Sequence, residues 1–466
     1  MIERAVVPGP APGREPAADT VPEDAAHIRP ASRLRGELRM PGDKSISHRA
    51  LLLAALARGE SRIVGAGDGA DVRSTAGIVA MLGATVVRER ETGRTVDYRV
   101  VSPGIDGLVE PADVLDCGNS ATSLRLAAGV LAGMPVTAVL TGDASLRRRP
   151  VARIIEPLRS MGAVLHARRN DSLPPVTVVG RTPLRAIEAD MAVPSAQVKS
   201  AILLAGLRAD GRTTVREPVP TRDHTERMLR ARGVPVERIV DEGPPGGPVA
   251  WRIEGRVDVR AVTEAVPGDV SAAAFWLVAA AIHPDAELRL SGVGVNPSRR
   301  AILDHLRRMG AAIEEVPERP DDGVGEPTAT ITVRSSRLEG IELGPSDVAA
   351  SIDEIPILCL AATQAHGLTL IRGARELRHK ESDRLAGIVT GLLAVGASIE
   401  ATGDDLLIEG PTPLHGAEAD SLDDHRLAMT FAIAGLIASG ETIVLRPRSA
   451  AISYPGFFGD LEAVRA

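Results

Sequence analysis

The chain has 466 residues, 44% apolar and 25% charged, a balance typical of a soluble globular protein with two or three domains. Its formal net charge of -7 and its 2% aromatic content argue against a general nucleic-acid binder, because both the basic surface and the base-stacking platform are missing. The two cysteines, Cys117 and Cys359, lie in apolar contexts without metal-type spacing. This favours reduced thiols and a cytoplasmic protein.

The N-terminal segment, residues 1–30, is rich in Pro, Ala and Asp and lacks the apolar core of a signal peptide. We therefore expect it to be a disordered tail. No uninterrupted apolar run in the sequence reaches the roughly 18 residues that a membrane helix requires. The longest apolar runs, 272–282 and 427–439, are expected to be buried helices, so no membrane partner is expected.

From residue 41 onwards, one pattern recurs six times: a short polar motif, a helix rich in Ala and Leu, a turn and a β-rich strand. The copies begin near Pro41, Cys117, Pro194, Pro267, Ile352 and Asp424. Most copies then show a second helix that closes on a glycine, the expected C-cap residue: Gly83, Gly162, Gly233, Gly310 and Gly396. The pattern predicts an α/β protein of six strand–helix–strand–helix–strand units, divided into two domains of three. A solenoid is less favoured, because solenoid repeats are usually roughly 20–50 residues long.

Each polar motif lies where its apolar helix begins. Free backbone N–H groups and the positive end of the helix dipole make such a position a natural anion site. Six helix starts directed at a shared cleft would attract anions strongly without a high net charge. This convergence is a hypothesis at this point, because the pattern does not fix how the units are arranged.

Lysine is rare: of 54 Lys and Arg residues, only Lys44, Lys199 and Lys380 are lysines. All three lie in or beside a recurring motif, which favours a functional role for a compact, titratable ammonium group. Arg384 follows Lys380 by one helical turn, so a helix there would place both on one face. Forked guanidinium groups near helix starts suit the recognition of carboxylates and phosphates.

Two acidic positions also stand out. Asp353 interrupts an apolar run at a predicted helix start, where it could cap the helix or, close to Lys380, transfer a proton. Glu381 directly follows Lys380 and could form a surface pair with it or act as a second acid–base group. The residues alone leave both alternatives open. The sequence carries no phosphate-binding Walker motif and no metal-binding pattern of the HExxH or CxxC type.

The motifs resemble, in order, those of the 5-enolpyruvylshikimate-3-phosphate synthase family over roughly residues 32–464. They are PGDKSISHRA from 41, GNSATSLR from 118, GDASLRRRP from 142, PSAQVKSA from 194, TRDHTERM from 221, LRHKESDR from 377, DHRLAM from 424 and SYPGFF from 453. Several motifs in one order are far more specific than any single motif. The nearest alternative is the UDP-N-acetylglucosamine enolpyruvyl transferases, which have Lys-Asn where this chain has Lys44-Ser45. A catalytically dead anion-binding protein is disfavoured, because every expected acid and base is present.

The resemblance implies a two-domain enolpyruvyl transferase fold of six βαβαββ repeats with pseudo-threefold symmetry and the active site in the interdomain cleft. One domain is expected over residues 44–266 and the other over 31–43 plus 267–466, with a hinge near residues 43 and 267. The implied reaction transfers the enolpyruvyl group of phosphoenolpyruvate to the 5-hydroxyl of 3-phosphoshikimate, a step towards chorismate and the aromatic amino acids. The resemblance implies that the reaction requires neither a metal nor an organic cofactor. It also implies that the protein is a monomer.

The resemblance also implies roles for individual residues. The groups expected to bind 3-phosphoshikimate are Lys44, Ser45, Arg49, Ser195, Ala196, Gln197, Arg222, Asp353 and Lys380. Those expected to bind phosphoenolpyruvate are Lys44, Ala121, Arg149, Gln197, Arg384 and Arg426. Asp353 is implied as the acceptor of the 5-hydroxyl proton, Glu381 as the group that serves the enolpyruvyl methylene, and Lys44 as a proton donor near the tetrahedral centre.

Two positions depart from the commonest family pattern. Many members have Gly where this chain has Ala121, and the added methyl group should hinder glyphosate, which is longer than phosphoenolpyruvate. Some members have Lys where this chain has Ile452. One cationic contact is then absent or is supplied by another residue.

Overall fold

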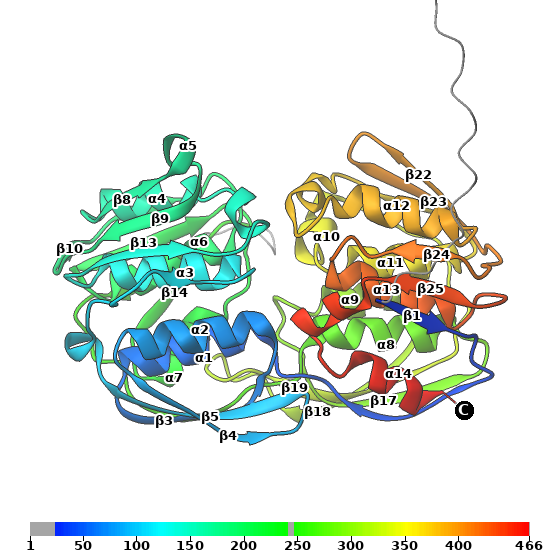
Figure 1. Ribbon diagram of the computed structural model, residues 1–466, viewed down its shortest axis with the longest axis horizontal. Coiled ribbons are helices and arrows are strands. Elements are labelled where there is room, and N and C mark those ends of the chain that lie inside the picture. The colour runs from blue at the N-terminus through cyan, green and yellow to red at the C-terminus, as the bar shows by residue number, and fades with distance from the viewer. Residues whose placement is uncertain (1–23, 241–246, 466) are drawn as a thin grey trace, which may run out of the picture.

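The computed structural model of the protein describes residues 24–240 and 247–465, which form two lobes (Figure 1). In the picture the left lobe runs from blue to green and the right lobe from green to red, with the first blue strand added to it. Both lobes are mixed α/β, as the recurring pattern predicts. Residues 1–23 of the predicted tail lie outside the described residues.

The four-stranded sheets of both lobes share the same strand order. In each, the first two strands are parallel and the remaining pairs are antiparallel. The sheets of the first lobe are β16-β3-β5-β4 (Thr263–Ala265, Arg58–Gly67, Thr95–Pro103, Thr85–Glu91), β6-β7-β9-β8 (Leu115–Asp116, Thr137–Thr141, Leu173–Val179, Val164–Ala167) and β11-β13-β15-β14 (Glu188–Asp190, Arg212–Glu217, Val249–Glu254, Val236–Val240). Those of the second lobe are β2-β17-β19-β18 (Leu34–Arg39, Ala286–Gly294, Thr328–Arg334, Ala312–Arg319) and β20-β21-β23-β22 (Glu342–Leu343, Gly367–Ile371, Asp405–Gly410, Ser398–Thr402).

The sheet of the sixth repeat has three strands, β24-β25-β1 (Glu418–Asp420, Thr442–Leu445, Ala25–Ile28). Strand β1 pairs antiparallel with β25 and takes the place that the last strand of the repeat occupies elsewhere. The prediction of a tail up to residue 30 is therefore wrong for residues 25–28. Its two alanines lower the β-propensity of this segment, and it forms a strand by pairing with the edge of β25.

The helices form two sets. The first helix of each repeat follows the polar motif: α1 (Lys44–Leu56), α3 (Ala121–Ala132), α6 (Ala196–Gly206), α8 (Val270–Ile282), α11 (Ile355–Thr363) and α13 (His425–Gly435). The second helices are α2 (Ala70–Met81), α4 (Ala152–Ser160), α7 (His224–Ala231), α9 (Ala301–Arg308) and α12 (Arg384–Ala394). The remaining elements are β10 (Leu184–Arg185), β12 (Ala209–Asp210), α5 (Arg168–Asp171), α10 (Pro345–Ala350), α14 (Phe457–Val464) and the 3-10 turns η1 (Ile105–Gly107), η2 (Leu146–Arg148), η3 (Arg375–His379) and η4 (Pro447–Ile452).

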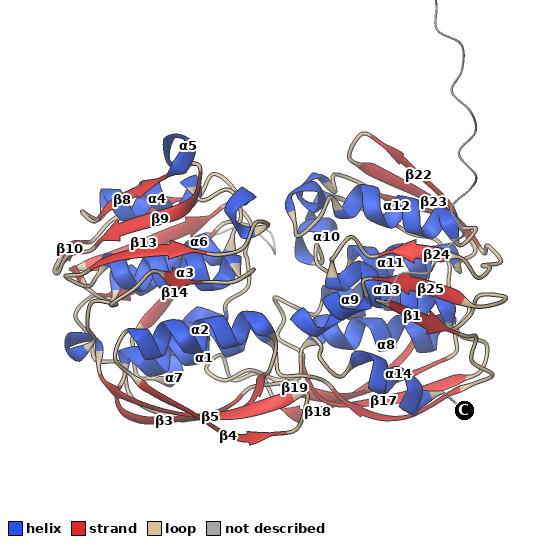
Figure 2. Ribbon diagram, in the orientation of Figure 1, coloured by secondary structure: helices blue, strands red, loops and turns tan. Residues whose placement is uncertain are grey.

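The first helices are buried on nearly all sides, whereas second helices such as α9 bury one face. Figure 2 shows the sheets on the outside of each lobe and the first helices between them. All five glycines expected to end the second helices have positive φ angles, between 80° at Gly233 and 104° at Gly162. The predicted C-caps are thus confirmed, since only glycine adopts this conformation without strain.

Buried apolar side chains form two clusters. One contains residues 46–266, and the other contains residues 28–40 together with 270–464. The chain thus begins in the second lobe, crosses to the first near residue 43 and returns near residue 267. The division into domains that move about a hinge at these positions stays a prediction.

The two crossing segments lie side by side and begin two equivalent helices. Asp43 donates its N–H to the carbonyl of Pro267 at 2.8 Å, and Asp269 donates to that of Pro41 at 2.9 Å. The carboxylate of Asp43 then caps α1 and that of Asp269 caps α8. Gly42 allows the first crossing segment to pack closely on β3, because a Cβ atom there would lie 2.0 Å from the carbonyl oxygen of Gly65. Side chains at the starts of α1 and α8 are therefore fixed relative to one another.

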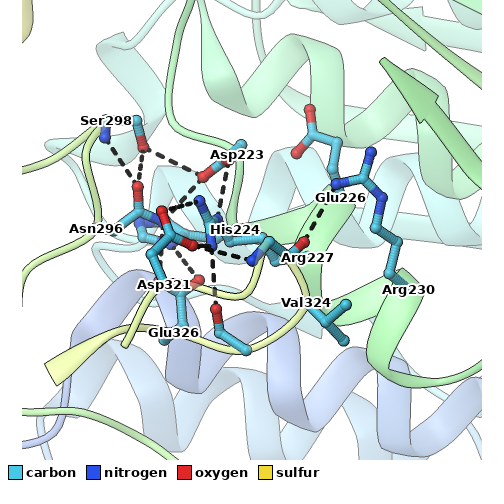
Figure 3. Close-up of polar contacts among 12 residues, drawn as sticks. Asp223, His224, Glu226, Arg227, Arg230, Asn296, Ser298, Asp321, Val324 and Glu326 are labelled. Carbon is cyan, nitrogen blue, oxygen red and sulfur yellow. Dashed lines mark hydrogen bonds and ion pairs between the residues drawn. The ribbon is translucent and has the colours of Figure 1, made fainter. Parts of the chain in front are cut away.

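A hairpin from each lobe also reaches the other lobe. Beside the β4–β5 hairpin, Arg94 forms an ion pair with Asp460 of α14. From the β18–β19 hairpin, Asp321 pairs with Arg227 of α7 at 2.6 Å (Figure 3). These hairpins, named the hairpin arms below, occupy the same position in the first and fourth repeats, so each lobe holds the other in the same way.

Candidate active site

The carboxylate of Asp353 lies where the two lobes meet. It accepts a hydrogen bond from Arg222 of the first lobe at 2.9 Å and from Lys380 at 3.3 Å, and it pairs with Arg384 at 3.6 Å. Burial would raise its pKa, but the charges of Lys380, Arg426, Arg222 and Arg384 hold the pKa of Asp353 well below its usual range. The alternative that Asp353 caps the helix is wrong, since Glu354 occupies the cap position of α11.

Glu381 forms a second acidic centre beside the first. Its carboxylate forms an ion pair with Arg384 and lies 3.5 Å from the guanidinium of Arg149, which comes from the first lobe. Although burial would raise the pKa of Glu381, the charges of Arg384, Arg149 and Lys44 hold it well below its usual range. The alternative of a simple surface pair with Lys380 does not describe this position, because Glu381 faces arginines from both lobes.

Lys44 is the first residue of α1, and Arg426 is the second of α13. Both line a small cavity between the lobes, together with Asp269, Ser271, Ala272, Phe275, Met429 and Ser453. The ammonium of Lys44 lies 3.1 Å from Asp71, and Arg426 lies 3.7 Å from Glu354. Ser453 directly follows Ile452, so the place where some family members have a lysine adjoins Lys44 and Arg426.

Arg49 lies one turn into α1 and is almost fully buried. It donates to the hydroxyls of Thr225 at 2.7 Å and Ser200 at 2.9 Å and to the carbonyl of Ser45 at 2.9 Å. Burial lowers its pKa to about 10. Arg49 therefore links α1, α6 and α7 by hydrogen bonds and contacts the backbone of Ser45.

The starts of α3 and α6 are joined in the same way. Gln197 donates through Nε2 to the hydroxyl of Thr122 at 2.9 Å, directly after Ala121. Its amide oxygen is buried and has no partner among the described residues. Ser195 caps α6 and Ala196 is its first residue, so backbone N–H groups and a free amide acceptor lie together here.

Lys199 does not join this cluster. Its ammonium is fully buried between Glu217 and Glu226, at 2.8 Å from each. Lys199 is thus a structural residue, and its position in the third motif reflects the packing of α6 on α7. The expectation that Lys380 and Arg384 share a helical face is also wrong, because α12 begins only at Arg384, with Asp383 as its cap. Both still reach Asp353.

Three residues with no separate signal in the sequence complete the site. Asp424 is fully buried and pairs with Arg384 at 2.7 Å, and its other oxygen accepts from the backbone of Arg426. Asp71 holds Lys44. His425 is buried with neither ring nitrogen bonded to a described residue, and burial and the charge of Lys44 keep its pKa well below the usual range. Asp424 and His425 could have been found from their positions beside Arg426.

Arg222 directly precedes the N-cap residue of α7. Residues of the second lobe hold the start of this helix (Figure 3). His224 bonds to Glu326 at 2.8 Å, and Asp223 accepts from Asn296 at 2.9 Å. Because Arg222 directly precedes these two residues, these contacts place its guanidinium at Asp353.

The arrangement offers anions a site with cations from both lobes and two carboxylates that stay ionised. Within the part of the chain that the structure describes, no helix has the length and apolar character to cross a membrane.

Known proteins resemble this chain over nearly its whole length. The family model described as EPSP synthase (3-phosphoshikimate 1-carboxyvinyltransferase) matches residues 28–461. The 3-phosphoshikimate 1-carboxyvinyltransferase of Anaeromyxobacter sp. (strain Fw109-5) is 52% identical over 92% of this chain and 96% of its own. That of Gloeobacter violaceus is 51% identical over 95% and 99%.

Solved structures give the same result. The EPSP synthase of Acinetobacter baumannii superposes with a TM-score of 0.82 and 38% identity, over 95% of this chain and 98% of that one. The enolpyruvyl transferase NikO from Streptomyces tendae has a TM-score of 0.75 at 22% identity, over 95% and 98% of the two chains, which shows a shared fold. These comparisons confirm the predicted fold class.

Proposed function

The chain belongs to the EPSP synthase (3-phosphoshikimate 1-carboxyvinyltransferase) family, and from this premise we propose how its residues carry out the reaction. The enzyme transfers the enolpyruvyl group of phosphoenolpyruvate to the 5-hydroxyl of 3-phosphoshikimate and releases phosphate. Its relatives support this activity and not the alternative transfer to UDP-N-acetylglucosamine. The assignment of individual residues below is our proposal.

The first task of the site is to hold two substrates that repel one another, since each carries a phosphate and a carboxylate. We assign the phosphate and carboxylate of phosphoenolpyruvate to Arg149, Arg384 and Arg426, with Lys44 between the substrates. We assign 3-phosphoshikimate to the start of α6, with Ser195, Ala196 and Gln197, and to Ser45, Arg49, Arg222 and Lys380. Buried guanidinium groups suit this role, because they remain charged and can donate two parallel hydrogen bonds to one phosphate or carboxylate.

The second task is proton transfer. Asp353 is proposed to accept the proton of the 5-hydroxyl as that oxygen attacks C2 of phosphoenolpyruvate. In the structure Lys380 and Arg222 bond directly to it and hold its pKa well below the usual range, which weakens it as a base. Anionic substrate groups that engage these cations would weaken their hold on Asp353. The substrate thus raises the basicity of the group that must deprotonate it.

Glu381 is proposed to serve the methylene carbon, which gains a proton on addition and loses it on elimination. The same reasoning applies, because Arg384 and Arg149 hold its pKa down until phosphoenolpyruvate binds them. Lys44 is close enough to lower the pKa of Glu381 and is proposed to stabilise charge at the tetrahedral centre and to donate a proton to a group next to that carbon.

One observation carries these assignments: Asp353 and Glu381, from the second lobe, are paired with Arg222 and Arg149 from the first. Release of inorganic phosphate should require both phosphoenolpyruvate and 3-phosphoshikimate, and UDP-N-acetylglucosamine should not replace the latter. Phosphate release that is independent of 3-phosphoshikimate would contradict the proposed function.

We further propose that the enzyme works as a cytoplasmic monomer without a nucleic-acid or membrane partner. One chain supplies cations from both lobes to the same carboxylates, so no second copy is needed to complete the site. Light scattering after size-exclusion chromatography should give the mass of a single chain, 48.7 kDa. A stable dimer at assay concentrations would contradict this.

A further inference from the structure

Four arginines of the first lobe gather around a cavity outside the proposed active site. Arg147 and Arg148 belong to the turn η2, and Arg168 and Arg169 belong to α5 at the tip of the β8–β9 hairpin. With Ala144 and Leu173 they line a cavity of about 290 Å³. Two segments that are distant in sequence thus bring cationic side chains to one hollow.

Unlike most arginines of this protein, these four lack acidic partners. No described carboxylate forms an ion pair with any of them, whereas Arg159, close by in α4, pairs with Asp171 at 2.6 Å. Arg147 donates to the carbonyl of Gly142 at 2.5 Å, and Arg168 to those of Arg147 at 2.9 Å and Pro174 at 3.2 Å. The guanidinium groups of Arg148 and Arg169 have no hydrogen-bond partner in the described part of the chain. Such neighbouring like charges repel one another unless an anion lies between them.

The backbone at Arg169 is strained. Arg169, Asn170 and Asp171 have φ angles of 54°, 53° and 63°, a left-handed conformation that Asn and Asp tolerate but that is unusual for a long side chain such as Arg169. The side chain of Asp171 secures the turn by accepting from the N–H of Ala167 at 2.8 Å. Strain of this kind persists where surrounding contacts enforce it, and it concentrates at functional positions. All four arginines are exposed, so what distinguishes them from other surface arginines is their clustering around one cavity and the left-handed turn that presents Arg169.

We propose that this arginine pocket binds a small polyanion, a phosphorylated or polycarboxylate metabolite with at least two anionic groups. The volume suits a molecule of that size, near the lower limit of ligand pockets. Forked guanidinium groups favour phosphate and carboxylate oxygens. The pocket is distinct from the phosphoenolpyruvate site, because Arg149, the next residue along the chain, turns instead to Asn119 at 3.0 Å and to Glu381.

Pyrophosphate is a suitable probe, and its binding can be followed by isothermal titration calorimetry in the presence of saturating 3-phosphoshikimate. The test compares the wild-type enzyme with an Arg148→Gln/Arg169→Gln variant. The matched control is Arg181→Gln/Arg185→Gln, which removes the same charge from two exposed arginines near the other end of the β8–β9 hairpin. Turnover without pyrophosphate should be the same, within about twofold, in all three proteins.

We expect the pocket variant to lose one class of pyrophosphate site, with affinity at least tenfold weaker, while the control retains it. Equal binding by the wild type and the pocket variant would overturn the proposal, because the probe would then bind only at the active site. Equal loss in both variants would also overturn it, since general charge would explain the effect. Arg169→Gln alone, a change on an exposed turn, gives the same comparison if the double variant melts early. Phosphate release from the substrates tests the proposed function separately.

Discussion

Asp353 receives three cationic side chains, one of them from the opposite lobe. If it accepts the 5-hydroxyl proton, Asp353→Asn should lower kcat by about 100- to 10,000-fold, the usual contribution of a general base. The Michaelis constants should not rise, because the amide leaves Arg222 and Lys380 free to bind substrate. Phosphate release measures turnover, and calorimetry measures 3-phosphoshikimate binding. Asp113→Asn, at an exposed position, is the control. Unchanged turnover in Asp353→Asn would contradict the assignment.

The depressed pKa of Asp353 also predicts a dependence of stability on pH. A carboxyl group whose pKa is lower in the folded than in the unfolded protein stabilises the fold above the unfolded pKa, about 3.9. That contribution disappears as the pH falls through the folded value. The free energy of unfolding of wild type should therefore exceed that of Asp353→Asn at pH 7, and the difference should shrink on acidification towards pH 3. Urea unfolding at several pH values measures it, and a difference that grows in acid would contradict the direction of the shift.

Ala121 is the first residue of α3 and is only partly buried. Its methyl group is expected to hinder glyphosate more than phosphoenolpyruvate. Ala121→Gly should therefore lower the inhibition constant of glyphosate, by about tenfold if the methyl group costs roughly 1.4 kcal/mol, with a smaller change in the Michaelis constant for phosphoenolpyruvate. Steady-state inhibition of both proteins tests this. A wild-type inhibition constant already well below that Michaelis constant would refute it.

At the scale of the elements, local signals predicted most of the architecture. The six first helices and the glycines after the second helices follow from patterns within about 30 residues, because helix periodicity and C-cap conformation are local properties. The spacing of Lys380 and Arg384 predicts too early a start for α12. The helix begins after Asp383, because the side chain of Asp383 accepts a hydrogen bond from the backbone N–H of Ala386. Strand β1 was missed because only β25, more than 400 residues away, makes it a strand.

Lys199 shows why a motif position does not establish a role in the site. The lysine and both glutamates beside it are fully buried, and Glu226 and Glu217 raise the pKa of the lysine although burial opposes its charge. Lys199→Met leaves two buried acids without a cation and should destabilise the fold by about 3–5 kcal/mol. Urea unfolding measures this.

A triple variant, Lys199→Met/Glu217→Gln/Glu226→Gln, provides the matched control for the triad. It removes the ion pairs without leaving a buried charge, so much of the lost stability should return. If the single variant is as stable as wild type, the triad does not hold α6 to α7 in the way proposed.

At the scale of the whole molecule, the sequence could not show which cations meet which acids. Arg222 and Asp353 are 131 residues apart, and their contact depends on how the two lobes face each other. The motif order points to the family, but the pairing follows from the crossing segments at residues 41–43 and 267–269 and from the hairpin arms. The crossing segments and the hairpin arms leave no periodic pattern in the sequence. A single ion pair or hydrogen bond between distant residues does not constrain the residues around it.

The hairpin arms give the last prediction. Arg227 pairs with Asp223 and Asp321, and Arg227→Gln removes charged hydrogen bonds that each contribute about 1.5–3 kcal/mol. Because Arg222 directly precedes the start of α7, loosening this arm should raise the Michaelis constant for 3-phosphoshikimate roughly tenfold, the effect of about 1.4 kcal/mol. Once both substrates are bound they bridge the lobes themselves, so kcat should stay within about twofold. The radius of gyration of the free enzyme, measured by small-angle scattering, should increase. Arg212→Gln, which removes a pair with Glu254 inside the first lobe, should change neither quantity. If Arg227→Gln behaves like this control, the arm does not set the relative position of the lobes.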